Sequence, residues 1–291
     1  MWVLLALIGA FGSATGDAIG KRLLGGNINI LFLGGAQFLL SGLLLSIVVF
    51  YVGIPVLSAS FWWAVLATVL INVAAQYLTF QALKIADISV ISPMIAFTPV
   101  FLILTAFVML HELPSLRGAV GILLVVIGSY VLNTAFFTEP FAEVWKRFRH
   151  SRAVLYMLGV AFLFSISSVF DKVASLTSSP LFASAAIHVL LGLCFFILLY
   201  AFSHTSIGTG TLRVKTFAPW LFLLGGVTAV SAWASNTALT MEIVPYVISV
   251  KRTSMLFAVL YGALLFKEVQ IPSRFLGASI MLVGVVLIAF S

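Results

Sequence analysis

Residues 246–266 have the sequence YVISVKRTSMLFAVLYGALLF. Apart from Lys251 and Arg252 the run carries no charge, and about 20 apolar residues suffice for a helix to cross the hydrocarbon core of a bilayer. A charge near the middle of such a helix costs about 2.5–3.5 kcal/mol. Two adjacent cations there predict a site that binds an anion. The alternative is that both long side chains place their charges at the membrane surface.

The composition places the whole chain in a membrane. The sequence is 63% hydrophobic and 8% charged, whereas soluble domains are about 25% charged. Apolar runs of spanning length recur, so we predict an all-α integral membrane protein. Ten transmembrane helices are expected, at residues 2–22, 29–51, 61–83, 89–110, 115–133, 153–174, 181–203, 217–240, 246–266 and 272–290. Pro93, Pro99 and Pro245 predict kinks or helix ends in the fourth and ninth.

Several classes of function are excluded by the same composition. The connections between the predicted helices are too short to form a soluble catalytic domain, so we expect no enzymatic activity. The single cysteine, Cys194, forms no intramolecular disulfide and no metal cluster, and we predict neither a metal nor a cofactor. The net charge is +7, but the sequence offers no soluble basic face, so we expect no binding of nucleic acids. The expected partners are the lipid bilayer and a small-molecule substrate. The oligomeric state stays open, a monomer included.

Positive charges favour one side of the predicted membrane. Of the 15 Lys and Arg residues, eleven fall in odd-numbered connections, which the positive-inside rule assigns to the cytoplasm. In the longest connection, residues 134–152, apolar side chains recur at helical spacing among basic ones, as in helices that lie on an anionic leaflet. A solvated basic loop is the alternative. We expect a multi-pass protein of the plasma membrane, with this linker in the cytoplasm and both termini outside.

The two halves of the chain resemble each other. Glu112, Gly121 and Gly128 recur at an offset of 156 residues as Glu268, Gly277 and Gly284. The matches predict two units of five helices, residues 1–133 and 153–291, joined by the linker 134–152. Because five is odd, the second unit enters the membrane from the opposite side, which gives the inverted repeats common in secondary transporters. Val90-Ile91-Ser92 recurs one residue out of step, at an offset of 157, as Val247-Ile248-Ser249. By this match the positions equivalent to Lys251 and Arg252 are Met94 and Ile95, so the charge is specific to the second half.

These motifs resemble a known family. The pattern Ile91-Ser92-Pro93, Thr98-Pro99, Glu112, Gly121 and Gly128 is similar to the repeat of EamA-type members of the drug/metabolite transporter superfamily. The run from Ser249 through Phe266-Lys267-Glu268 to Gly284 is similar to it as well. The resemblance covers essentially the whole chain, and it implies ten helices and transport without ATP. It leaves the substrate open among amino acids, sugars, nucleotide sugars, phosphates and amphipathic drugs.

Within that superfamily, the pair Lys251-Arg252 is similar to a basic pair in the ninth helix of the organophosphate/phosphate antiporters, where the pair holds phosphate. Lys172 resembles a lysine in the sixth helix of the same branch, and the resemblance implies that it assists in binding. Members of the superfamily are generally drawn with both termini in the cytoplasm, opposite to the charge count above. The two indications conflict at this stage.

Two carboxylates fall late in equivalent helices, Asp17 in the first and Asp171 in the sixth. As structural residues they would form ion pairs, Asp17 with Lys21 at i+4 and Asp171 with a cation of the ninth helix. As functional residues they would couple transport to protons by exchanging a proton for a cationic partner. Both interpretations stay open, and an ion pair between Asp171 and Arg252 would leave one charge in the anion site.

Aromatic and amide side chains suggest the wall of a substrate cavity. In the third helix Asn72 and Gln76 share a face, with Tyr77 beside them; the repeat pairs Tyr77 with Trp233, and Asn236 follows by three residues. Such residues stack on a ligand and hydrogen-bond to it. The alternative is that they hold helices together, since amides bond across helices in membranes.

Together these features predict a secondary active transporter that moves a small organic anion, phosphorylated or carboxylated, by alternating access. Lys251 and Arg252 would bind the anionic group, and Tyr77 and Trp233 would flank the organic part. One alternative is an exporter of amino acids or amphipathic metabolites and drugs. An alternative of another class is a membrane protein that binds lipid or serves as a scaffold without transporting.

Overall fold

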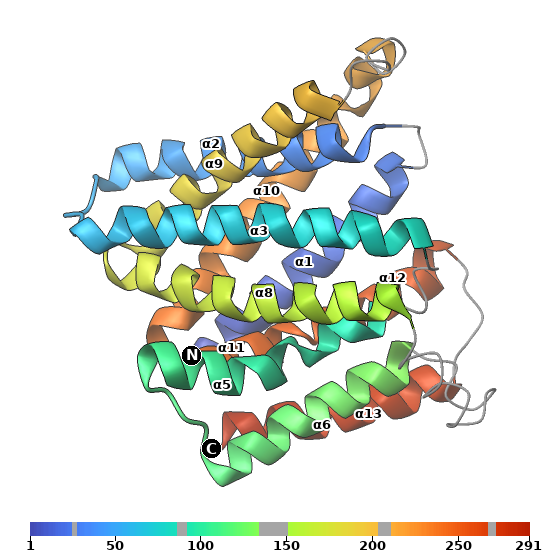
Figure 1. The fold of residues 1–291 in the computed structure, drawn as a ribbon. Helices are drawn as coiled ribbons and strands as arrows, with labels where there is room; N and C mark the ends of the chain where they lie inside the picture. Colours follow the sequence, from blue (N-terminus) through green and yellow to red (C-terminus); the bar gives the residue numbers. More distant parts are fainter. Residues whose placement is uncertain (25–27, 86–91, 134–150, 203–210, 267–271) are drawn as a thin grey trace. The chain divides into compact units, whose positions relative to one another are not determined.

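The structure is a computed structural model that describes residues 1–24, 28–85, 92–133, 151–202, 211–266 and 272–291 (Figure 1). These residues form helices and no strands, which confirms the predicted all-α class. The elements are α1 (Trp2–Leu24), α2 (Ile30–Val52), α3 (Ala59–Ile85), the 3₁₀ helix η1 (Ser92–Phe97), α5 (Thr98–Leu110), α6 (Leu116–Asn133), α8 (Arg152–Leu176), α9 (Pro180–Phe202), α10 (Thr211–Met241), α11 (Val244–Lys251), α12 (Ser254–Phe266) and α13 (Pro272–Ala289).

Six helices of the described part are long and apolar enough to cross a membrane by length and composition. They are α1, α2, α3, α8, α9 and α10. Shorter apolar helices occupy residues 94–110, 116–132 and 275–289. Every predicted span therefore coincides with a helix or with two consecutive helices. The linker 134–152 lies outside the described residues except for Ser151 and Arg152, where α8 begins.

The expectation of one continuous helix over residues 246–266 is wrong. The helix is interrupted after Lys251, where α11 ends, and resumes as α12 at Ser254. At the interruption the Thr253 N–H donates to the Val250 carbonyl at 3.0 Å, and the Thr253 hydroxyl donates to the same oxygen at 2.7 Å. A threonine hydroxyl that binds a carbonyl of the preceding turn competes with the regular helical bonds and bends the helix. The Thr253 bond accompanies the break, whereas Ser129 and Ser165 make the same bond inside the uninterrupted helices α6 and α8.

The fourth predicted span is interrupted in a similar place. It begins with η1 and continues as α5, which has Pro99 in its first turn, as the prolines predicted. The Thr98 hydroxyl donates to the Ile95 carbonyl at 2.7 Å, three residues back, as Thr253 does. The two helices after the breaks, α5 and α12, contain 13 residues each, and their first residues differ by the repeat offset of 156.

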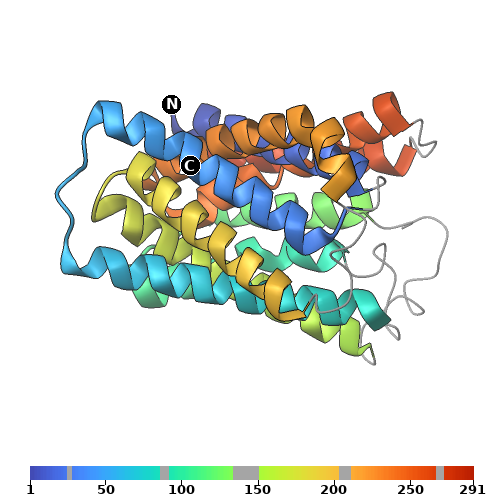
Figure 2. The same cartoon turned by 90° about the horizontal axis from the view of Figure 1, so that it is seen from above.

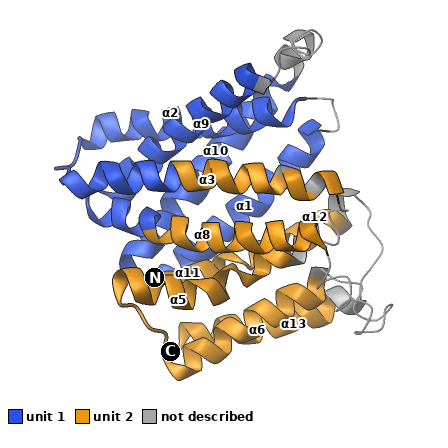
Figure 3. Cartoon of the chain, viewed as in Figure 1, with its two compact units in different colours: residues 1–69, 170–241 blue, residues 70–169, 242–291 orange. Residues whose placement is uncertain are grey.

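The chain divides into two compact units that differ from the two sequence halves (Figure 3). Unit 1 comprises residues 1–69 and 170–241, and unit 2 comprises residues 70–169 and 242–291. Each unit therefore combines helices of both predicted repeats, and the chain passes between the units within α3 and within α8. The predicted repeats are the two stretches of sequence that resemble each other, whereas the units are the groups of helices that pack together.

In unit 1, α2 packs along α9 and α1 packs along α10 (Figures 1 and 2). Glycines bring these backbones close. A Cβ atom on Gly42 of α2 would lie 2.6 Å from the Val189 nitrogen of α9, and one on Gly192 of α9 would lie 2.6 Å from the Leu39 nitrogen of α2. Association of helices in lipid depends on such close van der Waals contact, because lipid tails are as apolar as leucine.

In unit 2, the glycines that revealed the sequence repeat pack against one another across α6 and α13. A Cβ on Gly121 would lie 2.8 Å from the Gly284 carbonyl oxygen, and a Cβ on Gly284 would lie 2.7 Å from that of Gly121. Gly128 and Gly277 make the same reciprocal contact at 2.7 Å. Mutual contacts of this kind arise when two copies of one element meet about a two-fold axis. The two inverted repeats stay a prediction.

Replacement of Gly277 by leucine should destabilise the protein. The new Cβ would lie 2.6 Å from the Leu132 nitrogen and 2.7 Å from the Gly128 oxygen, and neither backbone atom can rotate away. Overpacking of this kind costs about 1–3 kcal/mol. The melting temperature in detergent should fall for Gly277→Leu and should not fall for the control Gly226→Leu, whose Cβ would meet nothing within 4 Å. Equal melting temperatures for the two variants would contradict the close packing of α6 and α13.

Candidate anion-binding site

The predicted cationic pair lies at the break between α11 and α12. Lys251 is the last residue of α11, and Arg252 closes the helix with its N–H donating to the Ile248 and Ser249 carbonyls at 3.1 Å. Residues 244–250 are all buried, and both cations are partly buried. Their role in binding an anion stays a prediction. The structure adds that they occupy an interruption of the helix, where transporters commonly form their substrate and ion sites.

The guanidinium of Arg252 is incompletely satisfied. Its Nε atom is buried and has no hydrogen-bond partner among the described residues. A buried N–H group without an acceptor is destabilising, by about 1–3 kcal/mol and more for a charged group. A side chain whose charge had reached the membrane surface would leave Nε in contact with water or lipid headgroups. The burial of Nε therefore favours the anion site over the alternative in which the charge lies at the surface.

The other end of α11 is fixed to the connection between α5 and α6. The Val244 N–H, in the first turn of α11, donates to Oε2 of Glu112 at 2.8 Å. The Ser115 N–H donates to the Tyr246 hydroxyl oxygen at 2.9 Å, and that hydroxyl donates to Ser115 Oγ at 3.2 Å. A Cβ on Gly118 would overlap the Tyr246 hydroxyl. Helix α11 is thus held at its N-terminus, while its C-terminus presents the cations.

These anchoring residues were not predicted from the sequence. Glu112 was identified as a residue of the repeat, and Tyr246 as the first residue of an apolar run. Pro245 in the first turn did indicate a helix start, which leaves backbone N–H groups to be satisfied. The acceptor that satisfies one of them lies 132 residues earlier in the chain, so no local pattern could identify it.

Asp171 and Lys172 lie in unit 1, whereas Lys251 and Arg252 lie in unit 2. The Thr68 hydroxyl of α3 donates to Oδ1 of Asp171 at 2.6 Å, and Thr68 is fully buried. Lys172 is only 8% exposed. Asp17 and Lys21 are both exposed on α1, at the i+4 spacing of a helical ion pair.

Two of the three predicted amides bond to serines on neighbouring helices. Asn72 donates to Ser167 Oγ at 2.7 Å, between α3 and α8, and Asn236 donates to Ser184 Oγ at 2.8 Å, between α10 and α9. These are the contacts expected if the amides hold helices together. Gln76 is partly buried on α3. Substrate contacts of the three amides stay a prediction.

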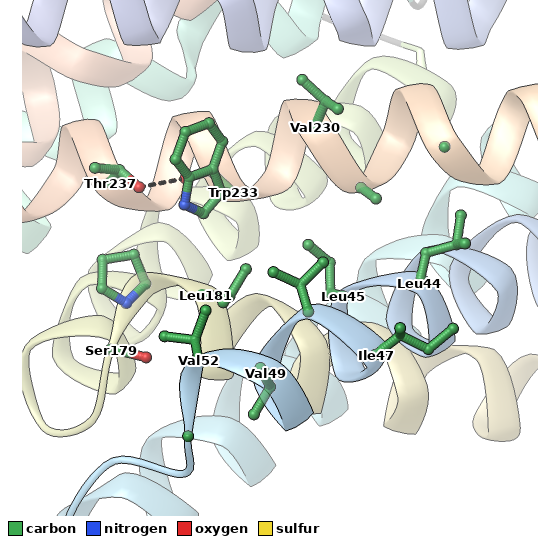
Figure 4. Close-up of a pocket in the computed structure, with 15 residues that line it drawn as sticks. Leu44, Leu45, Ile47, Val49, Val52, Ser179, Leu181, Val230, Trp233 and Thr237 are labelled. Atoms are coloured by element: carbon green, nitrogen blue, oxygen red, sulfur yellow. Dashed lines mark hydrogen bonds between the residues drawn. The ribbon is translucent and has the colours of Figure 1, made fainter.

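The two predicted aromatic residues belong to different units, so neither unit contains the pair. Tyr77, in unit 2, is 58% exposed, and Trp233, in unit 1, is 40% exposed. Trp233 lines an apolar groove between α2, α9 and α10 with a volume of about 890 Å³ (Figure 4). The described residues contain no cluster of three or more His, Cys, Asp or Glu side chains that could hold a metal ion.

Removal of the carboxylate that anchors α11 should destabilise the protein. Loss of a side chain that satisfies an N-terminal N–H group costs about 0.5–2 kcal/mol, so Glu112→Ala should lower the melting temperature. Glu112→Gln keeps an acceptor oxygen at the same place and should lower it less. If Glu112→Ala melts at the temperature of the unmodified protein, the bond to Val244 contributes nothing.

Known proteins resemble this chain in sequence and in fold. Residues 1–134 match the model of the EamA-like transporter family. The crystal structure of another protein superposes with a TM-score of 0.73 at 14% sequence identity, over 98% of this chain and 96% of its own. At that identity the likeness shows the fold alone. None of the curated proteins matches the chain.

The family match confirms the resemblance seen in the motifs around Glu112 and Gly121. EamA-like proteins are transporters of the drug/metabolite transporter superfamily rather than enzymes, and the apolar helices described above agree with a multi-pass membrane protein. Residues 1–134 are therefore similar to the EamA-like transporter family, and nearly the whole chain shares its fold with a solved structure.

Proposed function

We propose that the chain is a secondary active transporter of a small organic anion that carries a phosphate or carboxylate group. The observation that carries the proposal is the buried Nε of Arg252, which has no partner among the described residues at the break between α11 and α12. A bound anion would supply the missing acceptor and would neutralise the charge in the same step.

The chemistry of the two cations suits such a ligand. A guanidinium presents N–H groups in a planar fork that matches the two oxygens of a carboxylate or phosphate, whereas a lysine adds a mobile point charge. Arg252 would therefore orient the anionic group, and Lys251 would add affinity. Tyr77 and Trp233 remain the residues predicted to flank the organic part, and Lys172 the residue predicted to assist.

The two halves of the chain support a specific role for the charges. Met94, the residue equivalent to Lys251, lies in η1, immediately before α5, so both halves interrupt the helix at this point. Met94 is fully buried and apolar. The interruption thus occurs with or without charge, and the backbone alone does not require Lys251 or Arg252.

Alternating access would follow from the same electrostatics. A cationic site that is costly to bury when empty becomes less costly when an anion neutralises it, so an occupied site favours closed conformations. A ligand shifts such an equilibrium by the difference between its affinities for the two conformations. The proposed carrier would couple the occupancy of the site to closure in this way, with transport across the cell membrane as the result.

Replacement of Arg252 by methionine should weaken binding of the anion without destabilising the empty protein. Hydrogen bonds to charged groups contribute about 1.5–3 kcal/mol, which corresponds to an affinity about 10- to 150-fold lower. Removal of an unpaired buried charge relieves a desolvation penalty, so the melting temperature without ligand should stay the same or rise. Arg252→Lys keeps the charge without the fork and should bind with intermediate affinity.

The measurement is the shift in melting temperature as inorganic phosphate, phosphorylated metabolites and carboxylates are titrated into each variant. Uptake of the stabilising compound into proteoliposomes then tests transport. If aromatic amino acids or organic cations stabilise unmodified and Arg252→Met protein equally, the cations are structural, and the exporter of amino acids or amphipathic metabolites replaces the anion carrier.

A further inference from the structure

Unit 1 carries an apolar groove whose lining includes Trp233, one of the predicted substrate residues, and none of the predicted cations. The groove has a volume of about 890 Å³ and is lined by α2, α10 and the start of α9 (Figure 4). None of its 15 lining residues carries a charge. All of them belong to unit 1, whereas Lys251 and Arg252 belong to unit 2, so the groove can bind a ligand whether or not these two cations bind an anion.

The groove begins at helix ends and extends into the apolar region. Val52 is the last residue of α2, and Pro180 is the first residue of α9; both line one end. From there the lining reaches Leu44 on α2, eight residues earlier, and runs from Thr237 to Gly226 on α10. At a helical rise of about 1.5 Å per residue, these distances correspond to about 12 Å and about 16 Å.

That length corresponds to one leaflet of a membrane. The hydrocarbon core of a bilayer is about 30 Å thick, so the chains of one leaflet cover about 15 Å. A groove that starts where spanning helices end and runs about this far inward has the position and the length of a phospholipid acyl chain.

The polar atoms of the lining do not call for a polar ligand. The Thr237 hydroxyl donates to the Trp233 carbonyl at 2.7 Å (Figure 4). Ser179 Oγ accepts the Phe182 N–H at 3.2 Å, at the first turn of α9. Both side chains are therefore engaged in local helical bonds and lie toward the helix ends. The remaining lining is aliphatic apart from Trp233, which recognises apolar surface.

A second copy of the chain fits this surface less well. A dimer about a two-fold axis brings the same patch of both copies together, so it would place one groove opposite the other and leave the space between them empty. Helices in membranes associate through small residues, whereas this lining is mostly leucine, isoleucine and valine.

We propose that this groove is a binding site for one acyl chain of a bilayer phospholipid, with the headgroup at the end formed by Val52 and Pro180. The acyl chain lies along α10, from Thr237 toward Gly226, and contacts the Trp233 ring. The bound lipid stabilises the packing of α2, α9 and α10.

Gly226 provides a matched pair of variants. A Cβ there would meet nothing within 4 Å, so both alanine and leucine can be placed without a clash, and both favour a helix more than glycine does. Gly226→Ala leaves the groove open, whereas Gly226→Leu fills its inner end. Without lipid, both variants should melt at or above the temperature of the unmodified protein.

The experiment measures the melting temperature of the three proteins in a steroid-based detergent, which has no straight alkyl chain to compete. Dioleoylphosphatidylcholine is titrated in, and glycerophosphocholine serves as the headgroup without chains. The unmodified protein and Gly226→Ala should gain several degrees with the lipid, Gly226→Leu should lose most of that gain, and glycerophosphocholine should have no effect. The oligomeric state is measured in parallel by light scattering.

A second measurement reports on the groove directly. A phosphatidylcholine brominated on its acyl chains should quench the Trp233 emission, obtained as the difference between the unmodified protein and Trp233→Phe. The quenching should saturate and should be reversed by unbrominated lipid. Saturable quenching without a melting shift would still support the site.

The proposal is overturned if Gly226→Ala and Gly226→Leu gain equally from lipid while the Trp233 quenching fails to saturate. A shift caused by glycerophosphocholine alone would instead indicate a headgroup site. If Gly226→Leu changes the fraction of dimer, the groove is an interface between two copies and the lipid proposal fails.

Discussion

A helix that is interrupted inside a bilayer has to satisfy the backbone groups that the interruption frees, because the surrounding lipid offers no hydrogen bonds. The break at Arg252 and Thr253 meets this requirement locally. The two N–H groups bond to carbonyls of the preceding turn, and the Thr253 hydroxyl bonds to the Val250 carbonyl as well. At the start of α11 the same requirement is met by a side chain from elsewhere, Glu112. The position of the cationic pair depends on the local bonds at the break and on the bond from Val244 to Glu112.

The second constraint is that apolar burial provides little attraction between helices in lipid. Helices approach closely where glycines allow it and where hydroxyl groups cross the interface. Between α1 and α10 the Ser231 hydroxyl donates to the Gly9 carbonyl at 2.7 Å, and the space above Gly12 is occupied by Ser231. Between α6 and α13 the glycines contact one another directly. The packing of each unit therefore depends on small residues at a few crossing points.

The predicted substrate residues are distributed over both units. The aromatic residue Trp233 was predicted to lie at the substrate, and the structure places it on an apolar groove of unit 1. The cationic residues lie in unit 2, at a helix break. In the proposed carrier, Lys251 and Arg252 bind the charged part of the substrate. The proposed lipid chain stabilises the packing of α2, α9 and α10 in unit 1.

The sequence by itself determined what depends on composition and short spacing. It identified the membrane class, the positions of the spans among the described residues and the interruption that prolines predict in the fourth span, because lipid imposes length and polarity on each span separately. It did not predict the break after Lys251. It could not find the bond between Glu112 and Val244, or the reciprocal contacts of Gly121 with Gly284. It also could not separate units that mix the two halves of the chain. These features depend on which helix faces which, and that choice is made by close packing between residues more than 100 positions apart, for which no local pattern exists.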